Sequence, residues 1–228
     1  MKPERYDYSG LNLKTLFSPR YRHLLLLLDW VYFLIMYRLT ESLIPLERCV
    51  PMHCFVDDII PFNEFFVVFY ISWFVLIVVA LVRPMLYDIE SFKKVQIFIF
   101  LTQTIAFVFY ILLPSRQDLR PEVFARSNVF TWIMGIIYAA DTSTGVCPSL
   151  HVAYSLGILS VGLKDKTLGR SRKILLGVWV FLICISVCFV KQHSFLDVLA
   201  AVPMCLVIEI ILYGKQYWLP KIKGEKTA

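Results

Sequence analysis

The chain has 228 residues, of which 58% are hydrophobic, and a formal net charge of +6. A soluble domain averages roughly 45–50% apolar residues, so this composition excludes an ordinary soluble enzyme and favours one membrane domain over residues 1–228. The basic residues lie in short segments between apolar runs and not on one soluble face, so we expect no nucleic-acid partner. The first twenty residues are polar and mixed in charge, which does not resemble a signal peptide.

Six apolar runs predict an all-α, polytopic membrane protein built as a six-transmembrane-helix bundle. The runs cover residues 23–39, 62–82, 95–113, 149–163, 174–190 and 195–213. Runs of about 17–21 residues are long enough to cross a hydrocarbon core of about 30 Å. The fourth run is short for a full crossing, so we expect it to begin inside the interface on the outer side of the membrane.

Lys and Arg residues are distributed unevenly between the two sides of this predicted bundle. The N-terminal segment, the C-terminal tail and the loops after the second and fourth runs hold 17 of the 23. The opposite side holds Arg38, Arg48, Arg116, Arg120, Arg126 and Lys191. The positive-inside rule then predicts that both termini are cytoplasmic and that the loops at 40–61, 114–148 and 191–194 face outward, most simply from the plasma membrane.

Acidic residues occur in the first outer loop and inside two of the apolar runs. We expect the loop carboxylates to be solvated and not to bind a cation; they are Glu41, Glu47, Asp57, Asp58 and Glu64. For Asp29 and Glu209, which lie in the first and last runs, helix packing or snorkelling is favoured over a functional role.

Two other features lie in the predicted outer loops. The segment 122–140 is fairly apolar, which is typical of an interfacial helix, and we expect it to cover the motifs described next. Cys49 and Cys54 share one loop, and their spacing alone leaves open whether they form a disulfide.

The fourth run begins with Cys147-Pro148-Ser149-Leu150-His151. Pro is favoured at a first helical position, where its missing N–H costs nothing. The free N–H groups of that turn and the helix dipole form an anion site, to which Ser149 adds a hydroxyl donor. His151 can give or take a proton. A helix cap followed by an interfacial histidine explains this motif equally well when it is taken alone.

His193 and Asp197 are four residues apart, so they are neighbours on one helix face. A carboxylate that accepts the imidazole N–H fixes the tautomer and leaves the other ring nitrogen free to attack. A buried structural hydrogen bond is an equally good explanation of this pair alone.

The third element is Leu119-Arg120-Pro121, with Arg116 four residues before Arg120. Arg binds phosphate in a bidentate way and stays charged at any relevant pH, so two arginines outside the third run suit a phosphate clamp. Taken alone the signal is weak, because Arg-Pro dipeptides are common in loops.

In this order the three motifs resemble those of the type-2 phosphatidic acid phosphatase superfamily, whose patterns are K-x6-R-P, P-S-G-H and S-R-x5-H-x3-D. The matching residues are Arg120 and Pro121, then Pro148, Ser149 and His151, and finally Ser186, His193 and Asp197. The motif-bearing region covers about residues 113–200, and the six-run layout extends the resemblance over nearly the whole chain.

The resemblance implies a role for each matching residue. His193 would be the nucleophile that forms a phosphohistidine, and Asp197 would orient it. His151 would protonate the leaving oxygen, while Arg120 and Ser149 would hold the phosphate oxygens. The superfamily uses no metal, and we expect no cofactor.

The chain departs from the superfamily patterns at three positions. Leu113 stands at the Lys, Leu150 at the Gly, and Val187 at the Arg of the third pattern. Arg116 and Lys191 are close enough in sequence to replace the two missing cations. Pro-Ser-Leu-His without that Arg is also similar to the branch of inositol phosphorylceramide and sphingomyelin synthases, which transfer a phospho-headgroup.

These features predict an integral-membrane hydrolase that cleaves a lipid phosphate or diphosphate monoester at the outer leaflet, on the extracytoplasmic face. The alternative is a phosphotransferase that moves a phospho-headgroup to a lipid hydroxyl. A non-catalytic transporter using the polar cluster as an anion site is a third possibility, but no inverted repeat is visible in the sequence. The predicted partner is a lipid phosphate in the bilayer; the lipid's identity and the oligomeric state are left open.

Overall fold

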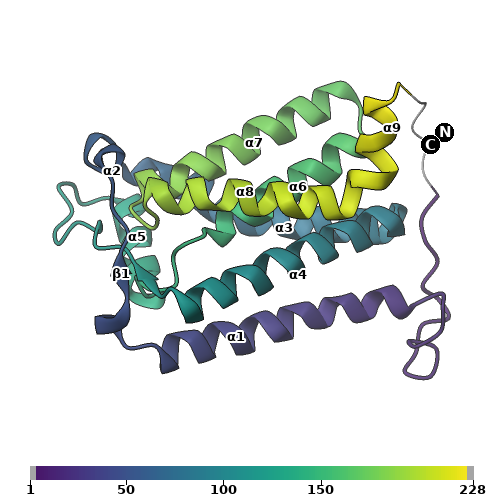
Figure 1. Ribbon diagram of the computed structural model, residues 1–228, viewed down its shortest axis with the longest axis horizontal. Coiled ribbons are helices and arrows are strands. Elements are labelled where there is room, and N and C mark those ends of the chain that lie inside the picture. The colour runs from purple at the N-terminus through teal and green to yellow at the C-terminus, as the bar shows by residue number, and fades with distance from the viewer. Residues whose placement is uncertain (1–3, 225–228) are drawn as a thin grey trace.

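The computed structural model describes residues 4–224 and shows long helices that run side by side in one bundle (Figure 1). The α-helices are α1 Asp29–Leu43, α2 Phe55–Ile59, α3 Val67–Tyr87, α4 Ile89–Leu112, α5 Val129–Ala140, α6 Leu150–Lys164, α7 Arg170–Phe189, α8 Phe195–Tyr213 and α9 Leu219–Ile222. Short 3₁₀ or π segments are η1 Arg22–Leu28, η2 Leu46–Arg48, η3 Glu64–Phe66 and η4 Gly214–Trp218. Two short strands, β1 Val50–Pro51 and β2 Ser115–Arg116, pair in parallel.

Within residues 4–224, five helical segments are long and apolar enough to cross a membrane. They are Arg22–Leu43, Glu64–Tyr87, Ile89–Leu112, Arg170–Phe189 and Phe195–Ile222. The chain thus has the helices of an all-α, multi-pass membrane protein. The remaining predicted run forms α6, whose 15 residues extend about 22 Å at 1.5 Å per residue, less than a hydrocarbon core. A sixth crossing therefore stays a prediction, as does the side on which the termini lie.

Helix α6 lies at the centre of the bundle and packs against α3, α4, α7 and α8. Its first two turns have little solvated face, since four consecutive residues are buried: Val152, Ala153, Tyr154 and Ser155. A helix that is buried on most sides belongs to the core. Gly157 lets α4 approach, because a β-carbon there would lie 2.3 Å from the Phe98 ring. This central position holds the beginning of α6, where the second motif lies.

One end of the bundle carries α2, α5 and the strand pair, and the opposite end carries α9 and the segment before α1 (Figure 1). The strands join the segments that follow α1 and α4, and a bridge between Arg116 and Thr144 adds the segment before α6. Helix α5 begins later than the predicted start at 122, because the Asn128 side chain caps it by accepting from the N–H groups of Phe130 and Thr131. Its place at a membrane interface stays a prediction.

Two of the five acidic residues expected to be solvated are buried, so that expectation is wrong for Asp57 and Glu64. Asp57 accepts hydrogen bonds at the start of α8, and Glu64 accepts one from the Asn128 amide at 3.0 Å. A buried carboxylate requires such donors, and only the tertiary structure brings them. Cys49 and Cys54, in the same loop, are both free thiols.

The acidic residues inside the apolar runs join helices to one another. Glu209 pairs with Lys164 at 2.6 Å and accepts a hydrogen bond from Ser160, which ties α8 to α6. Asp29 accepts a hydrogen bond from the Gln103 amide and so ties α1 to α4. The helix-packing interpretation of both residues is confirmed.

Candidate active site

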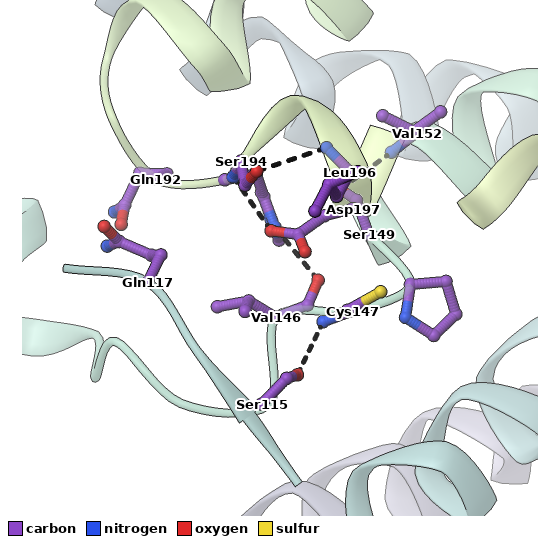
Figure 2. Close-up of polar contacts among 12 residues, drawn as sticks. Ser115, Gln117, Val146, Cys147, Ser149, Val152, Gln192, Ser194, Leu196 and Asp197 are labelled. Carbon is purple, nitrogen blue, oxygen red and sulfur yellow. Dashed lines mark hydrogen bonds and ion pairs between the residues drawn. The ribbon is translucent and has the colours of Figure 1, made fainter. Parts of the chain in front are cut away.

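His193 lies in the short loop between α7 and α8, directly before the helix cap Ser194. Its Nδ1 is 3.2 Å from Asp197 Oδ2 and 3.1 Å from the Val146 carbonyl oxygen. Both neighbours are acceptors, so in the neutral ring Nδ1 carries the proton and Nε2 keeps its lone pair. Asp197 is fully buried and also accepts from the Ser194 N–H at 2.9 Å (Figure 2). The predicted His193–Asp197 contact is therefore present.

Helix α2 holds the start of α8 in place. Asp57 accepts hydrogen bonds from the Ser194 hydroxyl at 2.6 Å and from the Phe195 N–H at 2.8 Å. Burial raises the pKa of Asp57, but these hydrogen bonds outweigh it and hold the pKa below its ordinary value. Lys191, with φ at 52°, donates from Nζ to the carbonyls of Asp57 and Ile60 at 2.8 and 2.6 Å. The ammonium group of Lys191 thus binds α2, and its contact with phosphate stays a prediction.

His151, in the first turn of α6, faces the same point. Its ring centroid lies 5.7 Å from that of His193, with 65° between the ring planes. The Tyr70 ring stacks on it at 4.6 Å and the Trp73 ring lies at 4.2 Å, both from α3. Its Nε2 is buried and has no hydrogen-bond partner among residues 4–224. The two imidazoles therefore meet from separate helices, with one nitrogen of each uncommitted.

Ser149 is the N-cap of α6 and is fully buried. Its hydroxyl accepts from the Val152 N–H at 3.5 Å, and its own N–H donates to the Asp197 carbonyl at 3.1 Å. The sequence predicted Pro148 at the first helical position, and this prediction is wrong. Pro148 precedes the cap, because the Ser149 side chain caps the helix. The backbone bond brings the beginnings of α6 and α8 side by side.

Cys147 lies beside these helix ends, in the segment before α6. Burial and then the Asp197 carboxylate raise the pKa of the Cys147 thiol to about 12. The thiol is thus protonated at neutral pH, which suits packing and not nucleophilic chemistry.

Arg120 connects the last turn of α5 and the residues after it to the loop that carries His193. Its guanidinium donates to the backbone carbonyls of Tyr138, Asp141 and Thr142 at 2.9–3.2 Å. It also donates to Gln192 Oε1 at 2.6 Å, next to His193. The Arg120 Nε is buried and without a partner among the described residues. One donor of the guanidinium is thus left unpaired there, and contact of Arg120 with phosphate stays a prediction.

The remaining predicted phosphate contacts have other surroundings. Arg116 pairs with Asp118 at 3.0 Å and donates to two backbone carbonyls in the segment before β1. Leu113 is 64% exposed, and Val187 is fully buried in the apolar core. Of the two positions where the superfamily has a Lys and an Arg, the first is thus an exposed leucine and the second is a valine of the apolar core. Contact of Arg116 with phosphate stays a prediction.

Several residues of this cluster were not predicted. Tyr70 and Trp73 cover His151, and Asp57 supports the start of α8. Gln117 and Gln192 are buried beside the motifs. Both glutamines stand inside or next to the motifs in the sequence, which was a usable signal. The aromatic residues and Asp57 belong to segments without a motif, so nothing in the sequence pointed to them.

No protein-family model, curated protein or solved structure matches this chain. The fold and the site define a class all the same: a helical multi-pass membrane protein with a two-histidine cluster, buried at His193 and partly buried at His151, at one end of its bundle. Within residues 4–224 no group of three or more His, Cys, Asp or Glu side chains could hold a metal ion. Because none of the comparisons gives a match, the resemblance to the phosphatase superfamily depends on the three motifs alone.

Proposed function

We propose that the chain is an integral-membrane, metal-independent lipid phosphatase that cleaves a lipid phosphate or diphosphate monoester through a phosphohistidine. One observation carries the proposal: the His151 and His193 rings lie 5.7 Å apart, and Nδ1 of His193 is held by Asp197. That arrangement matches a nucleophile oriented by a carboxylate and facing a second proton-transfer group.

In the proposed first step, His193 Nε2 attacks phosphorus and the bond from phosphorus to the leaving oxygen breaks. Protonated His151 gives its proton to that oxygen, and the lipid alcohol or phosphate departs. In the second step neutral His151 takes a proton from water, which attacks the phosphohistidine and releases phosphate. The Arg120 Nε and the Ser149 hydroxyl supply hydrogen bonds to the phosphoryl oxygens as charge develops on them.

The orientation of the proposed enzyme has its own support. The cluster lies at the end of the bundle with α2 and α5, while η4 and α9, with Lys215 and Lys221, lie at the other end (Figure 1). The positive-inside rule assigns the Lys-rich and Arg-rich end to the cytoplasm. With six crossings, both termini are cytoplasmic and the site is open to the outer leaflet of the plasma membrane, where phosphate would meet the helix ends and the lipid chain stays in the bilayer.

Phosphotransfer to a lipid hydroxyl is the second candidate function. The observation in its favour is Pro-Ser-Leu-His together with Val187, which is fully buried where the phosphatase pattern has an Arg; this combination is similar to the synthase branch. The covalent step is the same, and only the acceptor that attacks the phosphohistidine differs. A lipid labelled with ³²P in its headgroup, supplied with and without an acceptor lipid, separates the two: free phosphate favours hydrolysis and new phospholipid favours transfer.

The proposal is tested with the purified protein and a panel of lipid phosphates. His193→Ala should reduce turnover at least about a thousandfold and abolish ³²P trapping on the protein, because it removes the nucleophile. His53→Ala is the matched control, since His53 forms an exposed pair with Asp58 at 2.8 Å in the first outer loop. Near-normal phosphate release by folded His193→Ala would refute the phosphohistidine mechanism.

A further inference from the structure

Two buried glutamines next to the histidine cluster have amide nitrogens without an acceptor. Gln117 is 1% exposed and Gln192 is 3% exposed. The Nε2 atom of each is buried and has no hydrogen-bond partner in the part of the chain that the structure describes. Folded proteins pair the great majority of their buried polar atoms, so two unpaired amides at one site require an explanation.

The amide oxygens fix which way each side chain is turned. Gln192 Oε1 accepts from the Arg120 guanidinium at 2.6 Å, and Gln117 Oε1 accepts from the Leu119 N–H at 2.8 Å. Turning either amide over would set an NH₂ group against another donor. The NH₂ groups are therefore the free ends, and together they offer four N–H donors.

The two free ends belong to the same place in the molecule. Gln192 directly precedes His193, and the Gln117 backbone N–H donates to the Ser143 carbonyl, close in sequence to Val146, whose carbonyl oxygen contacts His193. In Figure 2 the two amide ends point toward one another. No hydrogen bond joins these two amides. Acceptor oxygens of a ligand would complete both.

Building on the proposed function, we propose that the amides of Gln117 and Gln192 bind the non-bridging oxygens of the phosphoryl group that His193 attacks. Phosphoryl oxygens accept hydrogen bonds strongly and carry the charge that neutral donors stabilise without adding a cation. The amides would then do the work of the cations that are missing at Leu113 and Val187. Arg120 has two roles: it donates a hydrogen bond to the anion, and its bond to Gln192 Oε1 fixes the orientation of the Gln192 amide.

The test measures binding of orthovanadate, an oxyanion of phosphoryl shape, to the purified full-length protein by titration calorimetry. Gln117→Met and Gln192→Met keep the side-chain length but remove the donors, and each should weaken binding about tenfold or more. Gln96→Met is the matched control, because Gln96 is equally buried but its amide already donates to the Leu26 carbonyl. That variant should bind vanadate like the wild type.

Gln192→Glu is the second variant, for the case in which loss of the Arg120 contact unfolds the methionine variant. It keeps an oxygen for Arg120 and replaces the amide donor by a second oxygen, so it should fold and lose vanadate binding. Wild-type binding by Gln192→Glu would mean that Gln192 only positions Arg120, which overturns its proposed contact. Wild-type binding by Gln117→Met, or no binding of vanadate by the wild-type protein, also overturns the proposal.

Turnover of lipid phosphates separates this inference from the proposed function. If the wild type hydrolyses them and both methionine variants keep its KM and kcat, the glutamine contacts are refuted and the phosphatase stands. If vanadate binds through the glutamines but no lipid phosphate is turned over, the oxyanion contacts stand and the phosphatase is refuted.

Discussion

Asp57 belongs to α2 but acts at the start of α8, where it contacts Ser194 and Phe195, one and two residues after His193. Its ionised form accepts three hydrogen bonds, the third from the Cys54 N–H at 2.9 Å. The bonds from Ser194 and Phe195 exist only when the segment that carries α2 folds against the start of α8. A loop residue therefore stabilises the helix that carries Asp197.

Replacing Asp57 by Asn should lower the free energy of unfolding by about 2 kcal/mol, because hydrogen bonds to a charged acceptor are lost. The pKa of Asp57 is lowered in the folded protein, so its stabilising effect is present above the ordinary aspartate pKa and is lost as pH falls through the lower folded value. Denaturant melts in detergent at pH 7 and at pH 3–4 measure both effects. Exposed Asp58→Asn is the control, and equal stability of the two variants would contradict the capping role.

At the scale of the elements, α6 is the helix that unites the site, because it carries Ser149 and His151 into contact with α3 and α8. Close approach to its neighbours depends on glycine at two positions. A β-carbon at Gly157 would lie 2.3 Å from the Phe98 ring, and one at Gly162 would lie 2.4 Å from Leu176. The Phe98 ring is buried and has little room to move.

Gly157→Ala should therefore destabilise the protein by about 1–3 kcal/mol through overpacking against α4. Gly177→Ala, in α7, should have the opposite sign and stabilise by about 1 kcal/mol, because a β-carbon there meets nothing within 4 Å and alanine favours a helix. Thermal unfolding in detergent gives both values. A stabilising Gly157→Ala would mean that α4 and α6 are farther apart.

For the whole molecule, the arrangement of the two ends in the membrane decides what the site can reach. Most Lys and Arg residues lie in segments of the sequence other than the loops next to His151 and His193. Five long apolar helices connect the two ends of the bundle. The proposed orientation has residue 13 in the cytoplasm and residue 123 outside. Both positions are accessible, with Leu13 86% exposed and Val123 83% exposed.

Single cysteines at these two positions test the orientation. In a Cys54→Ser background, Val123→Cys should react with a membrane-impermeant maleimide on intact cells, whereas Leu13→Cys should react only after permeabilisation. The reverse labelling pattern would mean that the site faces the cytoplasm. Equal labelling of both before permeabilisation would indicate an even number of crossings between them.

The elements themselves were largely predictable, because hydrophobic periodicity and length need no knowledge of neighbours. All six apolar runs are helices, and the errors lie at their ends. Helix α4 starts at Ile89 and not at 95, since Asp88 caps it by accepting from the Ser91 N–H at 3.1 Å. The polar first turn of α4 hid this start from a search for apolar residues.

Composition, the apolar runs and the spacing of His193 and Asp197 were determined by the sequence alone, because each depends on residues that are near one another in the chain. The tertiary structure decided what lies next to what across the chain: that the His151 ring stacks on Tyr70, that Asp57 reaches α8, and that two glutamines keep free amides beside His193. Such contacts join residues up to 138 positions apart in the chain. The free energy of burying and pairing their polar groups arises only once the helices are packed.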